Sequence, residues 1–147
     1  MQILTPDIEK LAAFLQATRS ALAQLDEPVR RSLEALREEV QAAFDSGGEA
    51  VGAAWPALAP STLRDKLRHG FPLQPLVRTG WLRDGWTVSM EGPGLGVLES
   101  AAPYARVHEE GLGHVPRRRF LPDPDDTLAV AADEIGKHVK EALGGSS

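Results

Sequence analysis

The chain has 147 residues, of which 42% are apolar and 25% are charged, and its net charge at neutral pH is −5. This size and composition predict a single domain, residues 1–147, that is large enough to bury a hydrophobic core. The absence of cysteine excludes disulfides and thiolate metal sites, and the absence of a long apolar run or a signal peptide predicts a cytoplasmic protein without membrane contact.

Residues 1–45 predict two helices. In the first, Thr5 is the expected N-cap and Pro6 the first helical residue; in the second, Asp26 is the expected N-cap and "DSGG" ends the helix. Both contain apolar residues at steps of three and four. The first stripe consists of Ile8, Leu11, Leu15, Thr18, Leu22 and Leu25, and the second of Val29, Leu33, Leu36, Val40 and Phe44.

Residues 53–122 predict a sheet region with short helices. One helix is expected at "STLRDKLRHG", capped by Ser61 and ended by Gly70. "WTVSME" alternates apolar and polar side chains, as a strand does, and "LGVLE" is its partner in a hairpin with the three-residue loop "GPG". A short helix is expected at Tyr104–Glu110, ended by Gly111.

Residues 123–143 predict a C-terminal helix. Asp123 is the expected N-cap and Pro124 the first helical residue, while Asp125 and Asp126 favour the positive end of the helix dipole. The predicted buried stripe consists of Leu128, Ala132, Ile135, Val139 and Ala142. All these elements together predict an α+β fold in which N-terminal helices and a C-terminal helix pack on a small antiparallel β-sheet.

The segment "PYARVHEEGLGHVPRRRF" gathers side chains that often carry chemistry. His108 and His114 are six residues apart with two glycines between them, whereas helical zinc sites use a spacing of four. Glu109 would point about 100° around the helix from His108. Because no catalytic or cofactor motif occurs elsewhere, we expect no enzyme activity, metal or cofactor. A small metal-dependent hydrolase using His108, Glu109 and His114 is the alternative hypothesis.

Three consecutive arginines, Arg117, Arg118 and Arg119, follow the second histidine. In an extended segment Arg117 and Arg119 would point one way and Arg118 the other, so no single face would gather all three charges. We therefore interpret "VPRRRFLP" as an arm whose arginines bind carboxylates of a neighbouring element or subunit. A nucleic-acid-binding module is the alternative, although no third of the chain is strongly basic.

Four segments in a fixed order resemble the phage virion morphogenesis family, the tail-completion proteins of Mu-like and related tailed phages. These segments are "AWPALAPSTLRDK", "LVRTGWLRDGW", "PYARVHEEG" and "VPRRRFL", and the resemblance covers roughly residues 30–125. The residues that carry it include Trp55, Thr79, Gly80, Leu82, Arg83, Tyr104, His108, Gly111, Pro116 and Phe120.

Two of these motifs also predict local structure. Thr79 is expected to cap a single helical turn that presents Trp81 and Leu82 to the core, with glycines at both ends. His108 is expected to form a hydrogen bond with the backbone next to Gly111.

The resemblance implies a structural virion protein that completes or terminates the tail and joins it to the head or neck. It implies a homo-oligomeric ring, with six as the expected number of copies, at the head-proximal end of the tail, assembled in the cytoplasm of the bacterial host. The implied partners are the tail tube protein, a head or neck connector protein, and DNA that passes without specific binding. A head–tail connector or neck adaptor is the alternative position.

The charge of the chain predicts the character of the ring lumen. Identical subunits of charge −5 favour a bore that is acidic or neutral, so that DNA does not adhere. Glu91 and Glu99 of the hairpin are the candidate lumen residues, because a hairpin lining a ring shows one face to the channel.

Overall fold

The computed structural model describes residues 7–144 and confirms the predicted α+β class. Its sheet is a single antiparallel pair of strands. The elements in chain order are α1 (Ile8–Leu22), α2 (Asp26–Asp45), the 3-10 helix η1 (Glu49–Val51), α3 (Pro60–His69), α4 (Trp81–Asp84), β1 (Trp86–Gly92), β2 (Leu95–Ser100), α5 (Ala105–Glu110) and α6 (Pro124–Gly144).

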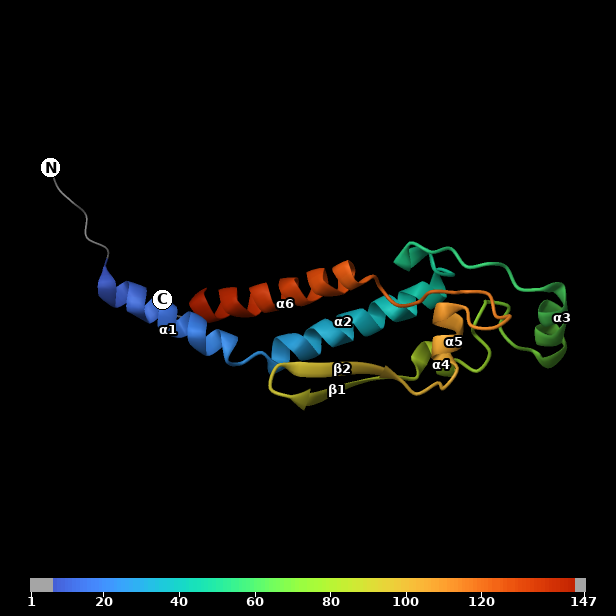
Figure 1. The fold of residues 1–147 in the computed structure, drawn as a ribbon, viewed down its shortest axis with the longest axis horizontal. Coiled ribbons are helices and arrows are strands. Elements are labelled where there is room, and N and C mark those ends of the chain that lie inside the picture. Colours follow the sequence, from blue (N-terminus) through green and yellow to red (C-terminus); the bar gives the residue numbers. More distant parts are fainter. Residues whose placement is uncertain (1–6, 145–147) are drawn as a thin grey trace.

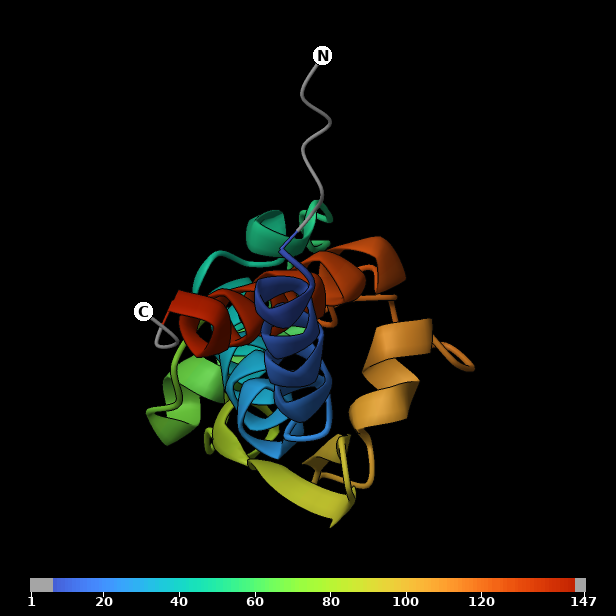
Figure 2. The same cartoon turned by 90° about the vertical axis from the view of Figure 1, so that its left-hand side faces the viewer.

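Helix α2 lies at the centre of an elongated molecule. Figure 1 shows α6 along one side of α2 and the β-hairpin along the other, while the short helices α3, α4 and α5 gather at one end. Viewed from the opposite end, Figure 2 shows α1 in front of α6, which it contacts. The residues of α2 that are buried between these layers are Pro28, Ser32, Leu36, Val40, Ala43 and Phe44.

The start of α2 is joined to the tip of the hairpin. Asp26 is the first helical residue rather than the predicted N-cap, and its Oδ1 accepts a hydrogen bond from the backbone N–H of Gly94 at 2.6 Å. Further along, a Cβ on Gly96 would lie 2.5 Å from Leu33 Cδ1 and 3.2 Å from Val29 Cγ1. Glycine in β2 therefore allows the sheet to approach α2 closely.

Helix α1 begins at Ile8, and its N-cap is Asp7, whose Oδ1 accepts a hydrogen bond from the backbone N–H of Lys10 at 3.1 Å. The predicted cap and first residue, Thr5 and Pro6, lie outside the described residues. The cap is local, so it fixes where the helix begins without fixing what the helix packs against.

The predicted apolar stripe of α1 is not a buried stripe. Its only buried residue is Ala21. Ile8, Leu11, Leu15 and Leu22 are between 48% and 73% exposed, because α1 contacts the end of α6 and extends beyond α2. The periodicity correctly predicts a helix, but within residues 7–144 its larger apolar side chains stay largely exposed.

The stripe predicted for α6 is rotated from the face that packs on α2. Leu128 is 68% exposed and Ala132 is exposed, whereas the other residues of the predicted stripe are half-buried. The inner face instead includes Glu134, whose Oε2 accepts a hydrogen bond from Nε of Arg31 on α2 at 3.0 Å. Because this polar residue lies on the inner face, the apolar pattern alone does not predict which face of α6 packs on α2.

Helix α3 starts at Pro60, two residues before the start that a cap at Ser61 would give. Pro60 occupies the first turn after Ala59, and no side chain caps the helix, so the prediction that Ser61 is the N-cap is wrong. Gly70 ends the helix as predicted, with a left-handed φ of 67°.

The hairpin has the predicted strands but a different turn. Trp86 pairs with Ser100 and Met90 with Gly96, and a bulge then leaves Glu91 without a partner before Gly92 pairs with Leu95. The connecting turn is therefore Pro93 and Gly94, two residues instead of the predicted three. The bulge supplies the extra residue that the expected loop would have contained.

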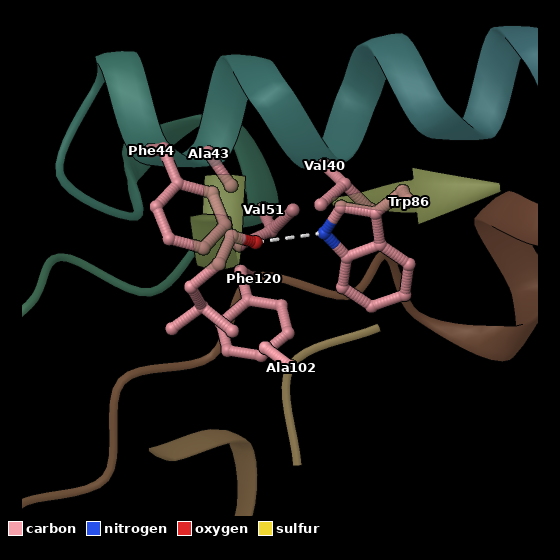
Figure 3. Close-up of a cluster of buried hydrophobic side chains, with 8 residues drawn as sticks. Val40, Ala43, Phe44, Val51, Trp86, Ala102 and Phe120 are labelled. Atoms are coloured by element: carbon pink, nitrogen blue, oxygen red, sulfur yellow. Dashed lines mark hydrogen bonds between the residues drawn. The ribbon is translucent and has the colours of Figure 1, made fainter. Parts of the chain in front are cut away.

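The core lies where α2, α4, β1 and the segment before α6 meet (Figure 3). Phe44 packs between Trp55 and Phe120, with ring centroids 5.3 Å and 5.2 Å away. Trp86 Nε1 donates a hydrogen bond to the backbone oxygen of Leu82 at 2.9 Å, so the buried indole has a polar partner. The core residues are Val40, Ala43, Phe44, Val51, Leu82, Trp86, Ala102 and Phe120.

No helix within residues 7–144 is long and apolar enough to cross a membrane.

Replacing Phe44 by Ala tests the position of the core. We expect Phe44→Ala to lower the free energy of unfolding by about 3–5 kcal/mol, because it leaves a cavity among rings that cannot collapse fully. The half-exposed Phe14 of α1 is the matched control, and Phe14→Ala should change the free energy of unfolding by about 0.5 kcal/mol or less. Urea unfolding measures both, and equal losses would show that the core lies elsewhere.

Candidate functional site: a cationic pocket

A pocket of about 530 Å³ opens between α3, α4, α5 and the segment 115–118. Most of its wall is apolar, and several of the predicted family-motif residues line it. The lining residues are Ala57, Leu58, Ala59, Thr62, Lys66, Leu76, Arg78, Thr79, Gly80, Trp81, Leu82, Tyr104, His108, Val115, Pro116 and Arg118.

Lys66, on α3, is buried with 5% of its surface exposed. Its Nζ donates hydrogen bonds to the backbone oxygens of Pro72, Gln74 and Val77 at 2.9, 2.6 and 2.6 Å. An ammonium has three N–H donors, so these contacts use all of them. Lys66 thereby holds the loop between α3 and α4 in place.

The positive charge of Lys66 has no carboxylate partner among the described residues. Burial lowers the pKa of Lys66, and the nearby charges of Arg78 and Arg118 lower it further. The carbonyls satisfy its donors without neutralising its charge.

Arg118 is the second buried cation of the pocket, with 6% of its surface exposed. Its Nε and Nη2 donate to the backbone oxygen of Pro56 at 3.2 and 2.9 Å, and Nη2 also donates to that of Ala57 at 3.2 Å. Burial lowers the pKa of Arg118, but a guanidinium stays charged in proteins. Within residues 7–144, its Nη1 forms no hydrogen bond and no carboxylate pairs with it.

His108 contributes a buried polar atom without a partner. Its Nδ1 is buried and has no hydrogen bond within the described chain, so the predicted bond to the backbone near Gly111 is wrong. Burial, and then the charge of Arg118, lower the pKa of His108, which keeps the imidazole neutral at neutral pH. A neutral Nδ1 can donate or accept a hydrogen bond, depending on the tautomer.

Aromatic and cationic side chains surround the mouth of the pocket. Trp81 is 48% exposed and meets the ring of Tyr104 edge to face, with centroids 5.9 Å apart. Arg78 lies over the ring of Phe71, 4.4 Å from its centroid, and forms an ion pair with Asp65 at 3.5 Å. The mouth therefore offers apolar contact area beside a guanidinium that is paired with Asp65.

The turn at α4 differs from the prediction in its cap. Gly80, with φ 83°, occupies the N-cap position and no side chain caps the helix, so Thr79 is not the cap. Leu82 is buried as predicted, whereas Trp81 is half-exposed and lines the pocket instead of the core. A Cβ at Gly85 would lie 2.5 Å from the backbone oxygen of Trp81, which explains the glycine after the turn.

Arg83 ties the α4 turn to the end of α2. Its Nε and Nη2 each donate to the carboxylate of Asp45 at 3.0 Å, in a bidentate pair. The hydrogen bond from Arg83 lowers the pKa of Asp45. This motif residue therefore orients the pocket wall relative to the central helix.

Glu109 has a structural role. Its Oε2 accepts hydrogen bonds from the backbone N–H groups of Phe120 and Leu121 at 2.8 and 3.2 Å. His114 is exposed, and residues 7–144 contain no group of three or more His, Asp or Glu side chains that could hold a metal ion. The geometry gives the alternative hydrolase hypothesis no support.

The three arginines do not share a face. Arg118 is buried, Arg117 is exposed and Arg119 is half-buried. Each has a partner within the chain: Arg117 Nε donates to the backbone oxygen of Glu109 at 3.1 Å, and Arg119 donates to the carboxylate of Asp123. Of the predicted carboxylate contacts, the one between Arg119 and Asp123 lies within the chain, and contact of the arginines with another subunit stays a prediction.

Other motif residues support the segment that carries Arg118. Trp55 Nε1 donates to the backbone oxygen of Arg119, and Phe120 is fully buried. Gly111 has a φ of 69°, and a Cβ there would lie 2.7 Å from Cβ of Arg117. Only glycine fits this turn, which brings α5 and the arginine segment together.

Glu91 and Glu99 lie on the outer, exposed face of the hairpin. Glu99 is opposite Thr87, and Glu91 is the unpaired residue of the bulge. Their position in a ring lumen stays a prediction.

The sequence did not predict the pocket. Lys66 belongs to a family-like segment, but its three acceptors are backbone oxygens in an irregular loop, which no side-chain pattern indicates. Leu76 also lines the pocket and has a φ of 61°, a strained backbone conformation for a residue other than glycine.

The sequence model of the phage virion morphogenesis family matches residues 6–140, a range that includes every residue lining the pocket. Neither the curated proteins nor the solved structures gave a match.

Lys66→Met tests whether the buried ammonium supports the α3–α4 loop. Because the change removes three hydrogen bonds from a charged donor, and each such bond contributes about 1.5–3 kcal/mol, we expect the free energy of unfolding to fall by at least about 2 kcal/mol. Amide exchange in residues 72–77 should also accelerate. Arg68→Met, at an exposed position of the same helix, is the control. Equal stability of the two variants would refute the role of Lys66.

His108 should make stability depend on pH. Its folded-state pKa lies below the ordinary value of 6.5, so unfolding takes up a proton between the two pKa values and stability falls as the pH drops below 6.5. We expect His108→Gln to lose less stability than the wild type between about pH 7.5 and pH 5.5, measured by urea unfolding. His114→Gln, at an exposed position, serves as the control. The prediction fails if all three proteins respond to pH equally.

Proposed function

Because the chain belongs to the phage virion morphogenesis family, we propose that it is a structural virion protein that completes the tail and joins it to the head. The observation that carries this proposal is the family match, which extends over residues 6–140 and so includes almost all of the described fold. Family membership itself means a role in the assembly of a phage particle.

The surface of the fold supports a role as a subunit of an assembly. Large apolar side chains of α1 are half-exposed or more, including Phe14 at the centre of the helix. Exposed apolar patches of this kind mark sites of protein contact. A protein that works as one member of a larger particle has partners for such a surface.

We propose further that identical copies form a ring, with six as the expected number, at the head-proximal end of the tail. One face of the ring would stop growth of the tail tube, and the other would bind a head or neck connector. Neither task requires catalysis. DNA would pass through a lumen kept acidic or neutral by the charge of −5 on each subunit, with Glu91 and Glu99 as candidate lumen residues.

The proposal is tested in the phage or prophage that carries the gene. A stop codon early in the gene should give particles in which filled heads and tails are separate, with the tail tubes irregular in length. Electron microscopy measures both features, and expression of the wild-type protein in trans should restore joined virions. Complete, infectious virions without the protein would contradict the proposal.

The same specimens distinguish the alternative position in the neck. Tails of normal, uniform length that fail to join heads would indicate a connector or adaptor rather than a tail terminator. A native mass measurement of the purified protein gives the number of copies in the assembly.

A further inference from the structure

We propose that the cationic pocket receives the first turn of α6 from a second copy of the chain, so that identical subunits join head to tail. This inference rests on the proposed ring and adds which surfaces form its subunit contact.

The pocket defines the chemistry of its occupant. Lys66 and Arg118 place two buried positive charges beside it, and no carboxylate within residues 7–144 pairs with either. Nη1 of Arg118 and Nδ1 of His108 still have hydrogen-bonding capacity. The rest of the wall is largely apolar. A carboxylate carried next to an apolar side chain complements all of these features.

The first turn of α6 presents that combination. Leu128 is 68% exposed, and Asp125 precedes it by three residues, so both side chains share one face of the helix. Asp125 has no ion pair or hydrogen bond through its side chain among the described residues. The two side chains therefore form an apolar knob beside a free carboxylate.

Negative charge accumulates around this turn. Asp126 stands next to Asp125, and its charge, after burial, raises the pKa of Glu39 on α2. A nearby like charge disfavours the ionised form of a carboxyl group. The positive end of the α6 dipole offsets part of the charge, and a cationic surface on another subunit would offset the remainder.

A chain cannot fill its own pocket in this way. Figure 1 shows α6 beginning beside the middle of α2, whereas the pocket lies nearer α3, between α3, α4 and α5. The two surfaces differ, so a contact between them is heterologous. Heterologous contacts between identical subunits form rings when the rotation closes.

The apolar face of α1 is the competing occupant within the chain. It carries larger exposed side chains, such as Ile8 and Phe14, but its acidic residues are confined to its first turn, where Asp7 already pairs with Lys10 at 3.4 Å. A long apolar helix face complements an apolar groove better than a pocket with two buried cations.

Two complementary variants test the contact. Thr62→Trp, at an exposed position of α3 in the pocket wall, should block the pocket, and Asp125→Lys with Leu128→Lys should remove the knob. We expect each change to weaken self-association at least about 30-fold, as loss of a hot spot does. Circular dichroism checks that both variants fold, and native mass spectrometry measures assembly.

An equal mixture of the two variants gives the sharper result. The pocket variant keeps an intact knob and the knob variant keeps an intact pocket, so the mixture should form one-to-one dimers that cannot grow, although each variant alone is monomeric. Thr87→Trp on the exposed face of the hairpin is the control that should assemble like the wild type, and Leu11→Lys tests α1 as the competing contact.

The outcomes separate this inference from the proposed ring. A wild-type protein that is monomeric at all concentrations overturns both. If the wild type assembles and either complementary variant assembles equally well, or the mixture forms no dimers, the ring stands and this contact is wrong. Loss of assembly in Leu11→Lys alone assigns the contact to α1 and overturns the pocket as its receptor.

Discussion

Two buried cations support the part of the fold that lacks regular secondary structure. The segments before α3 and between α3 and α4 contain many backbone carbonyls without helix or sheet partners. Arg118 binds the carbonyls of Pro56 and Ala57, and Lys66 binds three carbonyls of residues 72–77. These hydrogen bonds satisfy carbonyls that have no helix or sheet partner, so the two side chains hold irregular chain in place beside the core.

The hydrogen bonds of Lys66 and Arg118 to backbone oxygens also determine the electrostatics of the pocket. Carboxylates paired with Lys66 and Arg118 would neutralise the two positive charges. The backbone oxygens satisfy the hydrogen-bond donors instead, so both side chains keep a net positive charge beside the pocket. The neighbouring His108 responds to the same field, because the charge of Arg118 adds to burial in lowering its pKa. The features that suit the pocket to an anionic partner are thus consequences of how its walls are held together.

The parts of the fold that the sequence predicted are those governed by local rules. The period of α2, the alternation of β1 and the glycine at the end of α3 each follow from neighbouring residues, and the structure confirms them. Two of the errors arise where a distant group binds the side chain on which the prediction rested. Asp26 binds the tip of the hairpin instead of capping its own helix, and Glu134 turns α6 toward Arg31. The candidate site was the least predictable part, because Lys66 acts on backbone oxygens.

One end of the molecule contains the buried core, whereas the other end, formed by α1, buries little apolar surface. The core gathers around the C-terminal half of α2, where Val40, Ala43 and Phe44 meet Phe120. At the other end, Ala21 is the one buried residue of α1, and its larger apolar side chains face outward. Local stability follows buried apolar contacts, so α1 should open more readily than α2 in an isolated subunit. A partner that covers α1 would stabilise it by mass action, which couples the order of this helix to assembly.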